Sequence, residues 1–137
     1  MRLYYGRPIS EIQHQFNEVF PFLRLNFYRY AKTSPGFDRN NKTLPATTRL
    51  RAAGLTKAGE VELKEDMLVS ELEQQLSNDY GLSVQVLRRS GTVWLETTMT
   101  DSWTLGQQNQ HGHEISRNFV EKIPGSSEDF DLGRGNL

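Results

Sequence analysis

Apolar residues recur at intervals of three and four along two stretches of this chain. The apolar positions are Ile9, Ile12, Phe16 and Phe20 in the first stretch and Val69, Leu72, Leu76 and Tyr80 in the second. This spacing collects the apolar side chains on one face of a helix. We therefore predict amphipathic helices over residues 9–20 and 69–80, the second ending before Gly81.

Strict alternation replaces the helical spacing directly after each helix. Leu23, Leu25 and Phe27 alternate with other residues in the first copy, and residues 82–87 alternate in the second. Alternation over six residues predicts a strand with one buried face. Residues 1–3 and 61–63 predict a short strand before each helix. The segment SGTVWLETT, residues 90–98, predicts a hairpin partner for the strand that precedes it.

The two sets of predicted elements are related by an offset of about sixty residues. The polar residues Ser10, Glu11 and Gln15 recur as Ser70, Glu71 and Gln75. One βαβ unit cannot cover its own sheet, whereas two units can share one. We predict an α+β fold of two layers, a mixed sheet with helices on one face, built from two βαβ repeats in the ferredoxin-like or a related arrangement.

Other segments complete the predicted domain over residues 1–116, with repeats at 1–58 and 59–116. The region between the first repeat's strand and Gly54 is rich in loop residues and predicts a loop ending in a helical turn around Arg49 to Ala53. Asp101 is expected to cap a short helix that contains Trp103 and ends before Gly112. Residues 117–137 have few aliphatic side chains and predict a flexible C-terminal tail.

The segments VSELEQQLSNDYGLSVQVLRRSG and WLETTMTDSWTL resemble a family of small uncharacterised bacterial proteins with tandem helix–strand repeats. The resemblance covers residues 61–112 well and 1–29 loosely. It departs at Phe20–Pro21, where the family pattern has an aromatic–Gly pair. The matching positions are core, turn and cap residues, and the family has no assigned activity. The resemblance therefore implies an architecture and no catalytic residue.

Composition narrows the class of protein. The chain has no cysteine and no apolar run long enough to span a membrane or form a signal peptide, so we expect a cytoplasmic protein without disulfides. Residues 1–58 carry ten basic and three acidic side chains, a net charge of +7, whereas the remainder carries −8. Such halves can attract each other, and the basic half can meet a polyanion. The asymmetry is equally compatible with ordinary solvated faces.

Candidate catalytic chemistry is sparse. The three histidines, His14, His111 and His113, lack the spaced partners of a metal site, so we expect no metal and no cofactor. The sequence contains no nucleophile elbow and no phosphate-binding glycine loop. We therefore predict that the protein is not an enzyme.

The stretch RLNFYRYAK, residues 24–32, is the most suggestive part of the chain. If Leu25 and Phe27 face the core, Arg24, Tyr28 and Tyr30 face outward, as in surfaces that stack single-stranded bases. The alternative is a second apolar layer of Tyr28, Tyr30, Leu87 and Trp94, covered by residues 98–111 or by another subunit.

We favour the second interpretation. It predicts a non-enzymatic protein-interaction module that self-associates as a homodimer through the sheet face or an edge strand, with nucleic-acid binding through the basic, aromatic strand of the first repeat as the alternative. The predicted interaction surface consists of Arg24, Tyr28, Arg29, Tyr30, Arg88, Trp94 and Trp103.

Overall fold

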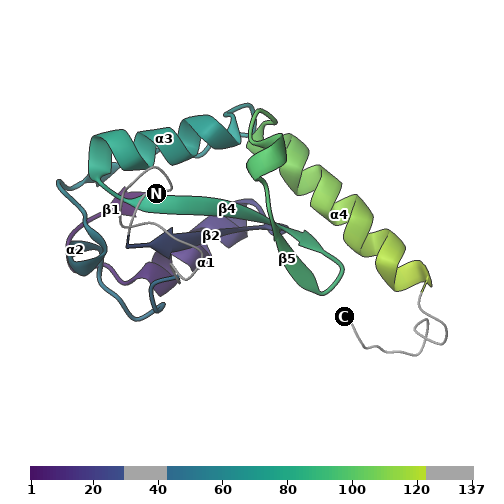
Figure 1. Cartoon of the computed structure of the whole chain (residues 1–137), viewed down its shortest axis with the longest axis horizontal. Helices are drawn as coiled ribbons and strands as arrows, with labels where there is room; N and C mark the ends of the chain where they lie inside the picture. The colour runs from purple at the N-terminus through teal and green to yellow at the C-terminus, as the bar shows by residue number, and fades with distance from the viewer. Residues whose placement is uncertain (30–42, 123–137) are drawn as a thin grey trace.

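The computed structural model describes residues 1–29 and 43–122, which form an α+β fold, as predicted (Figure 1). The elements in chain order are β1 (Arg2–Leu3), α1 (Ile9–Val19), β2 (Leu23–Tyr28), α2 (Leu50–Ala53), β3 (Gly59–Glu60), α3 (Val69–Tyr80), β4 (Ser83–Ser90), β5 (Val93–Glu96), the 3₁₀ helix η1 (Thr98–Thr100) and α4 (Leu105–Lys122). The helices, strands and hairpin expected from periodicity are present, except that the third strand is Gly59–Glu60 and not residues 61–63. Most of the predicted loop before Gly54 lies outside the described residues.

The described strands form two separate antiparallel sheets, where one mixed sheet was expected. One sheet has the order β2-β4-β5, and β1 pairs with β3 in the other. Over Leu23 to Leu25, the outer edge of β2 is closed to a further strand because α1 side chains occupy it. Gln13 Nε2 donates to the Leu25 carbonyl oxygen (2.8 Å), and Asn17 Nδ2 donates to the Leu23 carbonyl oxygen (3.0 Å). The ferredoxin-like arrangement is therefore not confirmed.

A single core lies between the helices and the larger sheet. Helix α1 packs beside β2 and α3 beside β4, and Figure 1 shows α3 running along β4. Ile12 of α1 and Leu72 of α3 are fully buried in the same cluster as Leu25 of β2 and Val86 of β4. The apolar stripes predicted for both helices thus point into one interior, and burial of these side chains is the main force that holds the elements together.

Helices α1 and α2 begin side by side and share backbone hydrogen bonds. The Ile9 N–H donates to the Thr48 carbonyl oxygen, and the Leu50 N–H donates to the Arg7 carbonyl oxygen, both at 2.9 Å. These bonds satisfy N–H groups that a helix start otherwise leaves without partners.

Helices α3 and α4 begin in the same manner. The Val69 N–H donates to the Trp103 carbonyl oxygen (3.0 Å), and the Leu105 N–H donates to the Met67 carbonyl oxygen (2.8 Å). Val69 and Met67 lie sixty residues after Ile9 and Arg7, so the two junctions correspond in sequence as well as in bonding. They differ in length: α2 has 4 residues and ends at Gly54, whereas α4 has 18.

The prediction for α4 is wrong at both of its ends. The cap is Thr104, whose Oγ1 accepts from the Gln107 N–H (3.0 Å) while Gln107 Oε1 accepts from the Thr104 N–H (2.8 Å). Asp101 lies in the preceding turn. The helix continues through Gly112. A glycine at this position lets α4 approach the sheet closely, since a Cβ on residue 112 would lie 3.0 Å from Cβ of Phe22.

Helix α4 ends at Lys122, so the predicted flexible tail overlaps its last turns. Residues 123–137 lie outside the described part of the chain, and the tail stays a prediction. Within the described residues, none of the helices is both long enough and apolar enough to cross a membrane.

Candidate interaction surface

Three of the seven predicted surface residues lie on the outer face of the larger sheet. This outer face consists of the β2, β4 and β5 residues whose side chains alternate with the core positions. Arg24, in β2, is directly opposite Leu87 of β4, and Leu87 is in turn opposite Glu96 of β5. Tyr28 lies farther along β2, and Trp94 lies on β5 opposite Arg89. The alternation of the sequence therefore located this face.

The other four predicted residues do not join this face. Arg29 is exposed directly after β2, and Tyr30 lies outside the described residues. Arg88 points to the inner side of the sheet, where its Nη1 donates to Oε1 of Gln108 in α4 (2.9 Å). Trp103 lies in the turn before α4. The seven residues predicted to form one interaction surface therefore do not lie on one face of the structure.

Arg88 belongs to a partly buried polar network that sequence reasoning missed. Gln108 is fully buried, and its Nε2 donates to the carbonyl oxygen (2.8 Å) and to Oγ1 (2.7 Å) of Thr100. Burial lowers the pKa of the Arg88 guanidinium, and its Nε has no hydrogen-bond partner among the described residues. This arginine links α4, and through Gln108 also η1, to the sheet on the side opposite the outer face.

The Tyr28 hydroxyl on the outer face resists ionisation. Burial raises the pKa of Tyr28, and the carboxylates of Glu96 and Glu73 raise it further, while a side-chain hydrogen bond with Asn26 acts in the opposite direction. The Tyr28 hydroxyl can therefore both donate and accept a hydrogen bond at physiological pH.

Arg24 and Trp94, from opposite edge strands, line one pocket of about 260 Å³ on the outer face. The remaining walls are Gln13, His14 and Asn17 of α1. Because Gln13 and Asn17 use their amide nitrogens to bond β2, their amide oxygens are left as acceptors. The pocket therefore combines an aromatic ring and a guanidinium with two amide oxygens.

Side chains cap the edges of β2, of the first half of β4 and of β1. The edge of β2 carries the two amides of α1 described above. In β4, the Val86 N–H donates to a Glu73 carboxylate oxygen (2.9 Å), and the Thr97 hydroxyl donates to the Val86 carbonyl oxygen (2.8 Å). In β1, Arg7 Nη1 donates to the Arg2 carbonyl oxygen (2.6 Å).

The short strand β3 is covered in a similar way. The Tyr80 hydroxyl donates to the carbonyl oxygen of Glu60 at 3.4 Å, the longest of these bonds. Side-chain caps of this kind prevent a foreign strand from pairing with the edge.

Within residues 1–29 and 43–122, strand β5 is the exception to this capping of strand edges by side chains. It is the last strand of the order β2-β4-β5, and no described side chain bonds its outer edge. Val93 is 52% exposed and Leu95 is 43% exposed on the side of β5 opposite Trp94. Sequence reasoning predicted the hairpin but did not single out these two residues, because alternation does not reveal which strand of a hairpin will lie at the edge of the sheet.

The described residues contain no group of three or more side chains that could hold a metal ion. No protein-family model, curated protein or solved structure matches this chain. The geometry of the molecule alone therefore supports the functional proposal.

Proposed function

We propose that this chain is a non-enzymatic, cytoplasmic protein-interaction module that forms a homodimer through strand β5. The observation that carries the proposal is the contrast between β5 and every other strand edge described. Where side chains cap β1, β2, β3 and the first half of β4, β5 offers backbone N–H and C=O groups to a partner strand.

A second copy fits this edge because β5 is self-complementary. Antiparallel pairing about a twofold axis at Trp94 places Trp94 opposite the same residue of the second copy and Val93 opposite Leu95. Both cross-strand contacts on the Val93 side are then apolar, and alternate backbone groups of β5 supply the hydrogen bonds. The resulting interface is isologous and closes at two copies.

Sedimentation equilibrium of the full chain and of a Leu95→Asp variant tests the dimer. We expect the wild type to be dimeric and Leu95→Asp to be monomeric, since a carboxylate opposite Val93 would be desolvated without a partner. Met99→Asp is the matched control, because Met99 is 95% exposed on η1 and lies outside β5. A wild type that stays monomeric at high concentration, or a Leu95→Asp variant that stays dimeric, contradicts the proposal.

The pocket between Arg24 and Trp94 favours a second candidate function, binding of single-stranded nucleic acid. A ring on which a base can stack lies close to a cation that can pair with a phosphate. Fluorescence anisotropy with single-stranded oligonucleotides should show binding that weakens as salt rises and that Arg24→Ala and Tyr28→Ala each reduce. Absence of binding at low salt rules this function out.

We further propose that residues 1–58 and 59–116 derive from one duplicated βαβ unit. The matching backbone hydrogen bonds at the two helix junctions support this origin. Met1 and Val61, sixty residues apart, also exchange both of their backbone hydrogen bonds, at 2.8 and 2.9 Å. If the units are equivalent, Ile12→Ala and Leu72→Ala should lower the free energy of unfolding by similar amounts, about 2–5 kcal/mol each. Clearly unequal losses would count against equivalence.

A further inference from the structure

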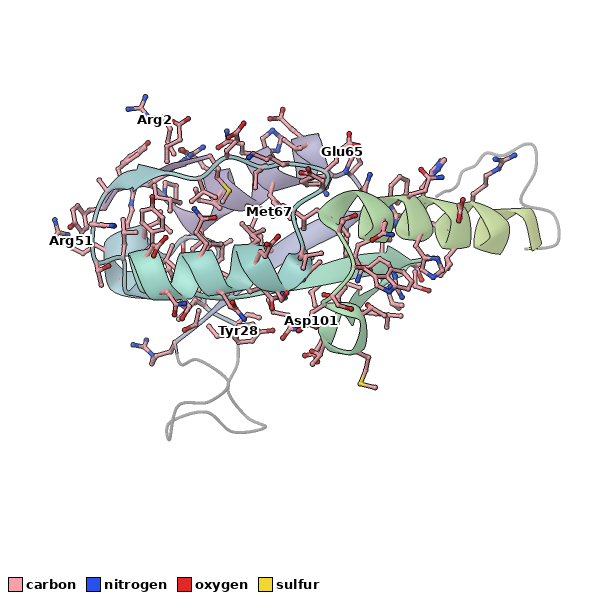
Figure 2. The ribbon with its side chains drawn as sticks, turned by 90° about the horizontal axis from the view of Figure 1, so that it is seen from above. Arg2, Tyr28, Arg51, Glu65, Met67 and Asp101 are labelled. Carbon is pink, nitrogen blue, oxygen red and sulfur yellow. The ribbon has the colours of Figure 1, made fainter. Side chains whose placement is uncertain are left out.

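The two helix junctions that share the same backbone hydrogen bonds carry opposite charge. At the junction of α3 and α4, a pocket of about 650 Å³ is lined by three acidic residues, Glu65, Asp66 and Glu114, together with the rings of Trp103 and His111. Figure 2 shows Glu65 beside the first turn of α4. We refer to these five residues as the acidic pocket.

The carboxylates of the acidic pocket have no cationic partner in the part of the chain that the structure describes. The ion pairs found there join Arg7 to Glu11, His14 to Glu18 and Lys64 to Glu62. Glu114 accepts only a hydrogen bond from the amide of Gln110. Three uncompensated carboxylates around an aromatic surface favour a guanidinium, which can pair with carboxylates and also stack on the indole ring.

The corresponding junction of α1 and α2 presents arginines. Arg49 Nη1 donates to the Gly6 carbonyl oxygen (2.7 Å), and the guanidinium of Arg51 lies 4.7 Å from the centre of the Tyr5 ring. Neither arginine forms an ion pair with a carboxylate of the described residues, and Arg51 is exposed. We refer to Arg49 and Arg51 as the arginine end.

We propose that the acidic pocket of one copy binds the arginine end of a second copy. The two surfaces cannot meet within one molecule, because Arg51 lies at the end of the fold remote from α4 while Glu65 lies beside α4 (Figure 2). Uncompensated charge of opposite sign on both surfaces identifies the occupant as a second copy of this chain. Each copy carries one surface of each kind, so the contact is heterologous and can continue from copy to copy.

This contact differs physically from the β5 dimer and does not depend on it. The β5 interface is isologous and largely apolar, whereas the contact between the acidic pocket and the arginine end is ionic and screened by salt. Salt therefore separates the two interfaces experimentally. The ionic contact also gives a role to the charge asymmetry between the two halves of the sequence.

The test uses the full chain carrying Leu95→Asp, so that the β5 interface is absent. Sedimentation velocity at about 50 mM and about 500 mM salt should show association at low salt that weakens at least about tenfold at high salt. Adding Glu65→Lys and Asp66→Lys, or adding Arg49→Glu and Arg51→Glu, should abolish association in each variant alone. An equimolar mixture of these two variants should associate again, because each then supplies the charge that the other lacks.

Glu18→Lys is the control, since it makes the same kind of substitution, one carboxylate replaced by a lysine, on α1 outside the acidic pocket; it should leave association unchanged. Arg51→Glu alone serves as a second variant if the double substitution disturbs α2, and circular dichroism verifies the fold of each protein. No salt-sensitive association of the parent, or no recovery in the mixture, overturns this proposal. A wild type whose mass Leu95→Asp leaves unchanged overturns the β5 dimer and leaves the ionic contact standing.

Discussion

Gly54 and Gly81 end two different helices directly against each other. Both adopt left-handed backbone conformations, with φ of 114° at the end of α2 and 74° at the end of α3. A Cβ atom on Gly81 would lie 2.7 Å from the carbonyl oxygen of Gly54, and one on Gly54 would lie 3.0 Å from the carbonyl oxygen of Gly81. The two chain reversals can pack together only because neither residue has a side chain.

Gly81→Ala should therefore lower the free energy of unfolding by about 2–3 kcal/mol, the combined effect of an unfavourable φ and a backbone clash. Urea denaturation measures the loss. Gly6→Ala is the control, since a Cβ at Gly6 meets nothing within 4 Å, and its effect should be small. Equal stability of the two variants would show that the close approach is unimportant.

Gln108→Leu should destabilise the protein by about 3 kcal/mol, because it leaves the Thr100 carbonyl and the Arg88 guanidinium without buried partners. Thermal and urea unfolding measure the change. Gln110→Leu replaces an exposed glutamine of the same helix and should cost far less. If the two substitutions have similar effects, the network between α4 and the sheet contributes little.

Stability should fall at alkaline pH through Tyr28. Its pKa is raised on folding from the ordinary value of 10.0, so the unfolded chain loses the phenolic proton first as pH rises. The stabilising contribution is complete below pH 10.0 and is lost as pH rises through the folded pKa. Across the alkaline range, the free energy of unfolding should therefore fall less steeply with pH for Tyr28→Phe than for the wild type. Parallel curves would contradict this assignment.

Removing the amides that cap β2 should expose a second open edge. Gln13→Ala combined with Asn17→Ala leaves the Leu25 and Leu23 carbonyl groups without these donors and should cost about 1–3 kcal/mol. Light scattering should also show increased aggregation, because an uncapped edge can pair with other chains. Glu18→Ala, at an exposed position of the same helix, should change neither property. Unaltered aggregation of the double variant would mean that α1 itself protects the edge.

The periodic parts of the sequence determined α1, α3, β2, β4 and the hairpin to β5. Helical spacing and alternation are local properties, and burial of one face reinforces each of them, so residues such as Ile12 and Leu25 could be assigned to the core without coordinates. The same alternation identified Arg24 and Trp94 as members of the outer face.

The division of the strands into two sheets, the length of α4 and the position of the open edge do not follow from the sequence pattern. These features depend on contacts between residues that are distant in the sequence, such as Gln108 with Arg88 or Glu73 with Val86. A side chain that caps a strand edge has no periodic signature, because its partner is a backbone group chosen by the packing. For the same reason, the exposure of Val93 and Leu95 and the opposite charge of the two helix junctions became visible only when the chain was folded.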